Sequence, residues 1–555
     1  MQLTGAEILI KVFIEQGVDC VFGYPGGSVL NIYDELYKAQ DRITHITTCH
    51  EQGAAHAADG YARVTGRPGV VIATSGPGAT NLVTGIANAY LDSVPMVAIT
   101  GNVSRALIGR DSFQEVDITG ITMPITKHNY MVKDVNRLAD IVREAFKLAI
   151  SGRPGPVLID IPKDIQSAHA EYEPMPGMQR TNGLKADEKS LKAALELIAK
   201  SKRPYIYAGG GVVNSDASVE LMALADILDC PIGTSMMGLS AVNNDHPRHL
   251  GMTGMHGRYA ASKVLSMSDL IIAVGTRFSD RATGNKQAYQ LGRKVLHIDI
   301  DPAEIDKNIV ADCSLLGDVK FILMQLMEAG VTRAPSDWAM QVDKVRQAPD
   351  SHLEMDKDTL NPQTAIEAVN VRLLPEDVIT TDVGQHQLWT AQYYHFRRPR
   401  TFITSGGLGT MGYGLGAAIG ACLGRGKKRT VLFTSDGSFH MNMNEMATAV
   451  TNKLPITVIV LDNNALGMVR QWQTLFYEER YSNTSLNRKT DYARLADAFG
   501  AKGFNASDLN SMNQALDEAF RIEGPTLIDV CIGCDVKVLP MIPPGGTIND
   551  IILKG

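Results

Sequence analysis

Short runs of aliphatic and β-branched residues recur along the chain, bounded by Gly, Asp or Pro and separated by helix-like stretches. Such continuous apolar runs are typical of parallel strands that helices cover on both faces. We expect strands at residues 70–74, 96–100, 157–161, 205–208, 270–274, 295–298, 378–381, 430–433, 456–461 and 527–530. The pattern therefore predicts an α/β protein made of three doubly wound parallel-sheet domains.

Two linker-like segments separate these strands into three groups. Pro174–Gly183 is rich in chain breakers and has no apolar period, and Gln347–Asp358 is polar. We therefore expect several domains, as a chain of 555 residues requires. The expected boundaries are 1–174 for an N-terminal domain, 184–346 for a central domain, 359–540 for a C-terminal domain and 541–555 for a tail.

Composition narrows the function classes. The net charge is −7, which gives no basic face for nucleic acid, and no apolar run approaches the roughly 20 residues that span a bilayer. The first residues are expected to open directly into a helix, without a signal or transit peptide. Seven scattered cysteines suit reduced thiols in the cytoplasm. Cys531 and Cys534 have redox-motif spacing, but no second pair accompanies them, so a structural role is favoured.

Polar residues follow two of the predicted C-terminal strands. Asp436-Gly437-Ser438 comes after the strand at 430–433, and Asn463-Asn464 comes after the strand at 456–461. A carboxylate, an amide oxygen and bare backbone N–H groups together suit a Mg²⁺ ion that holds a diphosphate. The spacing resembles the thiamin-diphosphate motif, in which Gly-Asp-Gly precedes Asn-Asn by a little under thirty residues.

Glu51 is the most prominent acidic residue of the N-terminal third. A zinc helix of the form His-Glu-x-x-His is excluded, because position 54 is Ala. One interpretation is a surface glutamate in the first turn of a helix. The flanking residues are almost all small or apolar, however, so we expect Glu51 to be buried and pushed toward its neutral form.

Three glycine-rich or polar turns are further candidates for ligand contact. Phe22–Gly27 is either a set of structural turn glycines or a weak phosphate loop. Ser405–Gly414 contains so many glycines that a ligand can approach its backbone closely. Asp382–His386 follows a predicted strand end, where open parallel sheets bind ligands.

Together these motifs resemble the thiamin-diphosphate decarboxylase and carboligase superfamily, and longer matches narrow the resemblance to the catalytic subunits of acetohydroxyacid synthase (acetolactate synthase). The resemblance extends over about residues 1–550. The longer matches are Tyr24–Gly27, Phe113–Glu115, Gly152–Pro156, Gly254–Gly257, Arg277–Arg281, Val383–Gln387, Leu466–Gln473 and Lys537–Gly545.

The resemblance implies roles for the cofactor-binding residues. Glu51 would protonate N1′ of the aminopyrimidine, the Gly409 carbonyl would accept from the 4′-amino group, and Met411 would hold thiamin diphosphate bent. Mg²⁺ would bind Asp436, Asn463 and the Ala465 carbonyl. The remaining thiamin-diphosphate contacts would be Val383, Gly384, Gln385, His386, Gly437, Ser438 and Met468.

The resemblance also implies substrate contacts. Arg281 would clamp the carboxylate of the second 2-keto acid, and Trp472 would shape the pocket for the ethyl group of 2-oxobutyrate. The Gly27 amide and Gln114 would stabilise negative charge on the oxygen atoms near the reacting carbons, and Lys163 would lie near the entrance of the active site. Phe113, Met255 and Met468 would exclude water. Without the resemblance these three would be core residues and Arg281 a surface ion-pair partner.

The resemblance implies FAD in the central domain, either with a structural role or as an evolutionary relic, since the ligation needs no net redox change. The FAD-contacting residues would be Arg153, Gly209, Gly210, Gly211, Met255, His256, Gly275, Arg277, Arg281, Asp299, Ile300 and Asp318. This set argues against the FAD-free catabolic synthases. Ser435 stands where the family has the first Gly of the metal-binding motif Gly-Asp-Gly. We expect the metal site to form with Ser435 if the φ angle of this residue is negative.

The implied activity is a transferase reaction that makes 2-acetolactate from two pyruvates, or 2-aceto-2-hydroxybutyrate from pyruvate and 2-oxobutyrate, at the start of branched-chain amino acid biosynthesis. Implied partners are a second copy of the chain that completes each active site, possible tetramers and a small regulatory subunit, with no nucleic acid and no membrane. The alternatives are an FAD-dependent pyruvate oxidase or another thiamin-diphosphate 2-keto acid decarboxylase, and a non-catalytic cofactor-binding protein.

Overall fold

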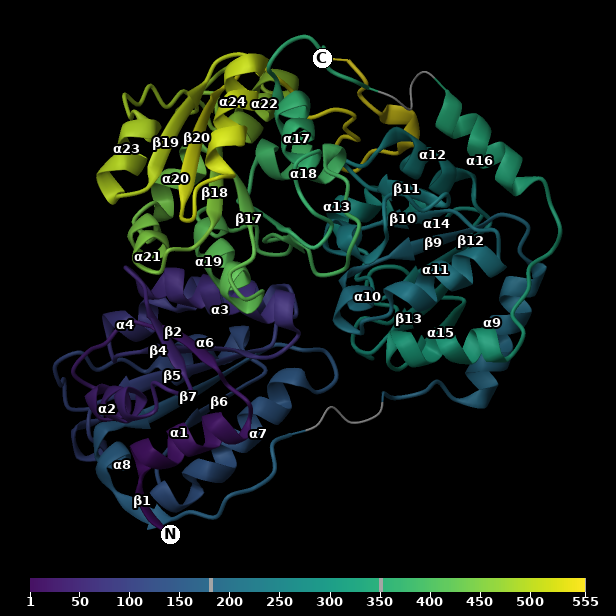
Figure 1. Ribbon diagram of the computed structural model, residues 1–555. Helices are drawn as coiled ribbons and strands as arrows, with labels where there is room; N and C mark the ends of the chain where they lie inside the picture. Colours follow the sequence, from purple (N-terminus) through teal and green to yellow (C-terminus); the bar gives the residue numbers. More distant parts are fainter. Residues whose placement is uncertain (179–182, 349–352, 555) are drawn as a thin grey trace.

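The computed structural model describes residues 1–178, 183–348 and 353–554, and the chain forms three lobes (Figure 1). Each lobe is built on a parallel sheet of six strands. The predicted fold class is therefore confirmed, and each sheet falls inside one of the expected domains. Parts of both predicted linkers, 179–182 and 349–352, lie outside the described residues, so the exact boundaries stay a prediction.

The first domain has strand order β3-β2-β4-β5-β7-β6, and β1 pairs antiparallel with β8. Because β1 precedes α1, the expectation that the chain opens directly into a helix was wrong by one short strand. The elements are β1 Gln2–Thr4, α1 Gly5–Glu15, β2 Cys20–Gly23, α2 Leu30–Lys38, β3 Thr44–Thr47, α3 Glu51–Thr65, β4 Gly69–Ala73, α4 Pro77–Asn81, α5 Val83–Leu91, β5 Met96–Asn102, α6 Ile118–Thr122, β6 His128–Met131, α7 Leu138–Ile150, β7 Pro156–Pro162, α8 Lys163–Ser167 and β8 His169–Glu171.

The central domain has strand order β11-β10-β9-β12-β13-β14. Its elements are α9 Glu188–Lys200, β9 Pro204–Ala208, α10 Gly210–Asn214, α11 Ser218–Ile227, β10 Ile232–Thr234, β11 His249–Met252, α12 Tyr259–Met267, β12 Leu270–Val274, α13 Asp280–Thr283, α14 Lys286–Gln290, β13 Lys294–Asp299, β14 Cys313–Leu316, α15 Val319–Glu328 and α16 Trp338–Gln347.

The third domain has strand order β16-β15-β17-β18-β20-β19. Its elements are α17 Pro362–Asn370, β15 Val378–Thr381, α18 Gln385–Tyr393, β16 Phe402–Ile403, α19 Gly414–Gly424, β17 Thr430–Ser435, α20 Asp436–Asn442, α21 Glu445–Thr451, β18 Ile456–Asp462, α22 Gly467–Phe476, α23 Tyr492–Phe499, β19 Lys502–Ala506, α24 Leu509–Ala519 and β20 Thr526–Cys531. None of the helices in the described part of the chain is long and apolar enough to cross a membrane.

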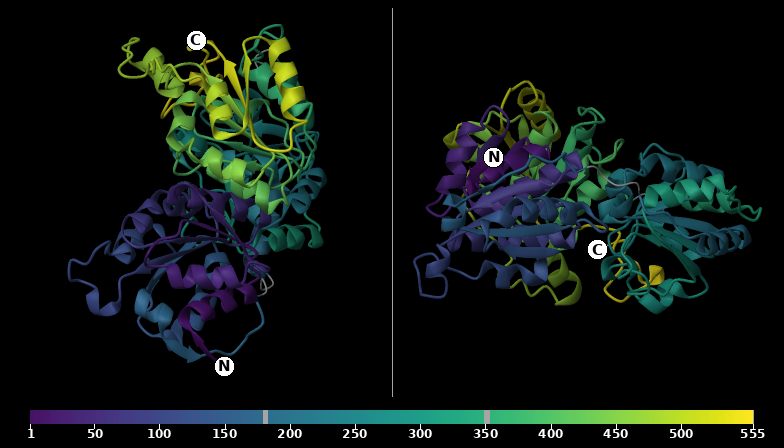
Figure 2. Two further views of the ribbon diagram at one scale, coloured as in Figure 1. Left: turned by 60° about the vertical axis from the view of Figure 1, so that its left-hand side comes forward. Right: turned by 90° about the horizontal axis from the view of Figure 1, so that it is seen from below.

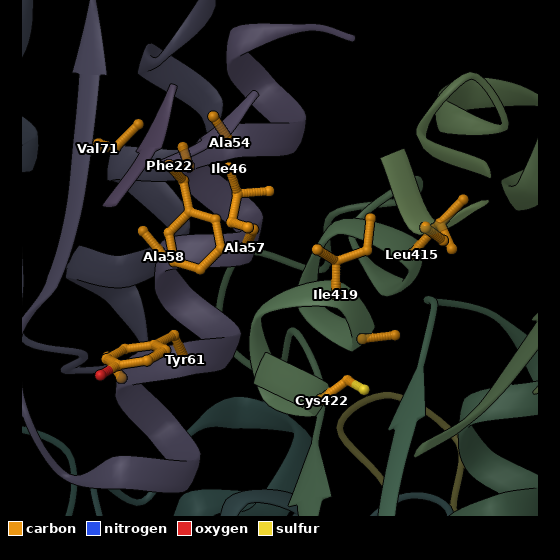
Figure 3. Packing of buried hydrophobic residues seen from close by; sticks show 14 of the residues in the cluster. Phe22, Ile46, Ala54, Ala57, Ala58, Tyr61, Val71, Leu415, Ile419 and Cys422 are labelled. Atoms are coloured by element: carbon orange, nitrogen blue, oxygen red, sulfur yellow. The ribbon is translucent and has the colours of Figure 1, made fainter. Parts of the chain in front are cut away.

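The first and third domains pack directly against each other (Figure 2), and helices α3 and α19 form the contact between them. A Cβ at Gly420 would lie 1.8 Å from the Ala57 carbonyl oxygen, so only glycine permits this approach. Apolar side chains of both helices, including Ala54 and Ile419, belong to one buried cluster (Figure 3). The N-terminus of α3, where Glu51 lies, is thus fixed against the third domain of the same chain.

Candidate active site

The strand-end carboxylate of the third domain is buried and unpaired. Asp436 is the first residue of α20 and is 1% exposed. Neither of its carboxylate oxygens has a hydrogen-bond partner among the described residues. Burial, followed by the nearby charge of Asp462, raises the pKa of Asp436 to about 7. An unpartnered buried carboxylate is costly, and a bound cation removes that cost.

Asn463 brings its oxygen to the same sheet edge from β18, the strand beside β17. The Asn463 side chain is buried; its Nδ2 donates to Gln385 Oε1 at 3.3 Å and its Oδ1 accepts from the Ala465 N–H at 3.1 Å. Ser435 has φ −128°, so the condition set for this departure from Gly-Asp-Gly is met, and its Oγ accepts from the Ser438 N–H at 3.4 Å. These oxygen donors fit Mg²⁺.

The segment Val383–His386 adjoins the metal motif. Ser438 Oγ donates to the Val383 carbonyl at 3.2 Å. Gln385 Nε2 donates to Gln471 Oε1 at 3.0 Å, which ties this segment to α22. His386 is buried, and burial lowers its pKa to about 3, so its ring is neutral. The structure thus brings together the residues expected around the diphosphate.

The glycine-rich loop faces this edge and is held from the first domain. Gly409 has φ +72°, a left-handed conformation that favours glycine, and Met411 Cε lies 3.8 Å from the position of a Cβ added to Gly437. The Asp92 carboxylate accepts from the N–H groups of Gly406 at 3.0 Å and Gly407 at 2.7 Å.

Glu51 lies in the first domain and is buried as predicted, at 9% exposed. Its Oε2 accepts from Asn81 Nδ2 at 2.9 Å. Phe113, by contrast, is 86% exposed, so its interpretation as a core residue was wrong. Gly27 and Lys163 are also exposed, and Gln114 adopts φ +58° beside Gly76.

A cleft of about 2140 Å³ opens between the domains. This exceeds the roughly 300–1,000 Å³ of an ordinary small-ligand pocket. Of the residues expected to contact FAD, all but Gly209 line it; Gly209 instead packs against Gly275. The expected active-site residues that line the same cleft are Met255, Arg281, Val383, Gly409, Met468 and Trp472. The other expected site residues do not line the cleft: Gly27, Glu51, Phe113, Gln114, Lys163, Gly384, Gln385, His386, Met411, Asp436, Gly437, Ser438, Asn463 and Ala465.

Arg281 and Trp472 meet in this cleft. The guanidinium carbon of Arg281 lies 5.6 Å from the centroid of the Trp472 ring, and Nη1 lies 3.3 Å from Met255 Sδ. Arg281 Nε is also 3.8 Å from Asp280, in an exposed pair that contributes little to stability. The pocket-wall interpretation of Trp472 therefore agrees with its position.

Sequence reasoning missed two buried acids at the junction of the first and third domains. Asp92 pairs with the buried Arg63 at 2.8 Å and holds the glycine-rich loop. Glu445 accepts hydrogen bonds at the start of α3. Glu445 stands beside Met446 and Ala447, and the argument that predicted the burial of Glu51 applies to it equally. Asp92 carries no comparable sequence signal.

Comparison with known proteins agrees with this geometry. Three family descriptions match: the N-terminal TPP binding domain of thiamine pyrophosphate enzymes at residues 3–121, their central domain at 191–326 and their C-terminal TPP binding domain at 382–530. The fold and the strand-end site thus define the class, that of three-domain thiamin-diphosphate enzymes.

Individual relatives narrow the class. The acetolactate synthase large subunit of Corynebacterium glutamicum is 44% identical over 99% of this chain and 90% of its own length. The acetolactate synthase isozyme 2 large subunit of Escherichia coli is 43% identical over the full length of both chains. The probable acetolactate synthase large subunit of Methanocaldococcus jannaschii is 43% identical over 99% of this chain and 95% of its own length. The chain belongs to the acetolactate synthase large-subunit family.

Proposed function

We propose that the chain decarboxylates pyruvate and joins the remaining two-carbon unit to a second 2-keto acid. The products are 2-acetolactate from pyruvate and 2-aceto-2-hydroxybutyrate from 2-oxobutyrate, which feed branched-chain amino acid biosynthesis. The observation that carries the proposal is the convergence of Arg281 and Trp472 in a cleft that also contains Gly409 and Val383. A carboxylate clamp and an apolar wall side by side suit a small 2-keto acid.

Thiamin diphosphate and Mg²⁺ are the proposed cofactors at the strand ends of the third domain. When bound, thiamin diphosphate supplies the electron sink that loss of CO₂ from pyruvate requires. Asp436, Asn463 and the Ala465 carbonyl would hold the metal, since both Asp436 carboxylate oxygens lack a hydrogen-bond partner in the part of the chain that the structure describes. Gly409 and Met411 would contact the pyrimidine and the bend of the cofactor.

Glu51 is the proposed proton donor to N1′ of the aminopyrimidine. It is buried, and Asn81 Nδ2 donates a hydrogen bond to one of its carboxylate oxygens. Glu51 begins α3 of the first domain, whereas the proposed metal ligands follow strands of the third domain, and we propose that two copies of the chain each supply one half of a site.

FAD is proposed as a structural occupant of the central part of the cleft. Arg277 and Arg153 line this part of the cleft, where Arg153 pairs with Glu304 at 2.6 Å, and a Cβ at Gly211 would lie 2.6 Å from Gly275 Cα. The glycines thus let the turns after β9 and β12 pack closely, which keeps the cleft open beside them. A pyruvate oxidase would also bind FAD, so occupancy does not distinguish the two enzymes.

A small regulatory subunit is a further proposed partner, because the similar chains are named large subunits. Association beyond a homodimer and a cytoplasmic location are also proposed. All seven cysteines are free thiols, which suits a reducing compartment.

Replacing Glu51 with Gln tests the catalytic assignment. The expected result is a loss of turnover of at least about 100-fold, since general acid–base groups contribute roughly 10²–10⁴-fold. Thiamin diphosphate binding, measured by tryptophan fluorescence, should stay within about threefold. Near-normal turnover by Glu51→Gln would overturn the assignment and favour a protein that only binds the cofactor.

A further inference from the structure

Glu445 is a buried acid of the third domain that none of the proposed steps uses. It begins α21 and is 0% exposed, nine positions after the metal-motif residue Asp436. Most of the hydrogen bonds of its carboxylate, however, come from another domain. Two of its three hydrogen-bond donors belong to the first domain, at the entry to α3.

The contacts fix the chain directly before Glu51. Glu445 Oε1 accepts from the His50 N–H at 3.0 Å and the Cys49 N–H at 3.2 Å. Glu445 Oε2 lies 3.2 Å from the same Cys49 nitrogen and accepts from Thr448 Oγ1 at 2.7 Å. Because the N–H groups at the start of a helix have no partner within the helix, this carboxylate satisfies the N–H of His50, the N-cap of α3, and that of Cys49 before it, in part-buried hydrogen bonds.

Close packing between Gly53 and Glu445 also restricts the position of α3. A Cβ at Gly53 would lie 2.2 Å from Glu445 Oε1, so the helix and the carboxylate are in direct contact. Glu51 lies between the bonded residues 49–50 and this contact. Its orientation therefore depends on where Glu445 holds the helix.

The ionisation of Glu445 is consistent with this function. Burial raises its pKa, while the hydrogen bonds from Thr448, Cys49 and His50 oppose that shift. The protein thus retains a costly buried carboxyl that its three donors stabilise in the ionised form. Such a group is expected where its hydrogen bonds are needed.

We propose that Glu445 is a positioning residue that holds the start of α3, and through it Glu51, from the third domain of the same chain. The inference rests on the proposed shared site, in which Glu51 serves the metal half of the partner subunit. Each third domain then has two tasks: it binds metal for its own site and sets the proton donor of the other one.

Glu445→Gln is the direct test, because the amide places a donor against the N–H groups that the carboxylate now accepts. We expect kcat to fall by about 10- to 100-fold, the scale of a misplacement of about 1 Å, with KM for pyruvate within about twofold. Proton exchange at C2 of bound thiamin diphosphate should slow by the same factor. Glu518→Gln, at an exposed position of α24, is the matched control and should change neither quantity.

Gly53→Ala keeps the proposal testable if Glu445→Gln does not fold. Its methyl group would displace the carboxylate from the other side, and the same slowing of C2 proton exchange is expected. Unchanged exchange in a folded variant of either kind would overturn the proposal.

Mixed dimers separate this role from an effect on the nearby metal site. Glu51→Gln mixed with Asp436→Ala is the control: shared sites predict that one intact site forms and activity returns. If this control stays inactive, the shared site itself is wrong. With the control active, Glu445→Gln mixed with Asp436→Ala should recover activity, and Glu445→Gln mixed with Glu51→Gln should not. The reverse pattern would show that Glu445 acts on the metal half and would contradict the proposal.

Discussion

The guanidinium group of Arg281 lies over the indole ring of Trp472, with its central carbon 5.6 Å from the ring centroid. Arg281 comes from α13 of the central domain and Trp472 from α22 of the third domain. A cation above an aromatic face is attracted by about 0.5–2 kcal/mol, depending on solvent exposure. The pair places the Arg281 guanidinium group beside the Trp472 ring in the cleft.

Arg281→Lys should weaken binding of the second 2-keto acid. An ammonium cannot form the bidentate pair, so kcat/KM for acetolactate formation is expected to fall by roughly 10- to 100-fold. Decarboxylation of the first pyruvate should be affected less. Quantifying CO₂ release and acetolactate in the same reaction checks the difference; an equal loss of both would contradict the role of Arg281.

Trp472→Leu should shift the choice of acceptor substrate. Trp472 lines the cleft, and removing its ring enlarges the space where the ethyl group of 2-oxobutyrate would pack. One methylene in an apolar pocket is worth about 1–3 kcal/mol, so preference for 2-oxobutyrate over pyruvate should fall about 10-fold or more. A competition assay with pyruvate and 2-oxobutyrate, in which the ratio of the two products is determined, measures this preference. Leu374→Ala, at an exposed apolar position of the third domain that does not line the cleft, is the control and should keep the ratio.

Asp92→Asn should loosen the glycine-rich loop. The variant weakens the bonds to Gly406 and Gly407 and leaves the buried Arg63 with Asp59 alone. Breaking a buried ion pair costs about 3–5 kcal/mol, so the melting temperature should fall by several degrees. Thiamin diphosphate affinity should fall as well, as titration of the folded variant can show. Unchanged affinity would mean that the loop keeps its position without Asp92.

Asp160 should make stability depend on pH. Its carboxyl group is buried, and burial raises its pKa to about 7 despite hydrogen bonds from Thr100 and Asn102. A raised folded-state pKa means that the folded protein binds the extra proton. The penalty is absent below the ordinary value near 3.8 and complete above about 7.

The stability gained by Asp160→Asn should therefore grow between pH 4 and pH 7, with a slope of up to about 1.4 kcal/mol per pH unit. Thermal unfolding of the variant and the unmodified chain across this range measures the difference. Asp140→Asn, at an exposed position of α7, is the control and should give a flat difference. A flat difference for Asp160→Asn as well would contradict the assignment.

The sequence predicted the sheets through their longest apolar strands. Strands such as β12 and β18 are rich in Val, Ile and Leu, and the sequence pattern predicted them. Strands such as β10, Ile-Gly-Thr, and β19, which contains Lys and Asn, were missed because they are short or polar. Their place in the sheet comes from pairing with a neighbouring strand, which a local pattern does not encode.

Local sequence patterns were equally limited in predicting the contacts of the candidate active site. The metal motif and the burial of Glu51 could be predicted from neighbouring residues. The contacts of Asp92 with Gly406 and of Glu445 with His50 connect positions 314 and 395 residues apart. Only the packing of the first domain on the third, through α3 and α19, brings these groups together.

Product analysis tests the central claim most directly. The purified chain, with thiamin diphosphate, Mg²⁺ and FAD, is given pyruvate and 2-oxobutyrate in the presence of phosphate and oxygen, and the products are separated and identified. The account predicts 2-acetolactate and 2-aceto-2-hydroxybutyrate, with one CO₂ released for each. Acetyl phosphate or free acetaldehyde as the main product, without either acetohydroxy acid, would contradict it.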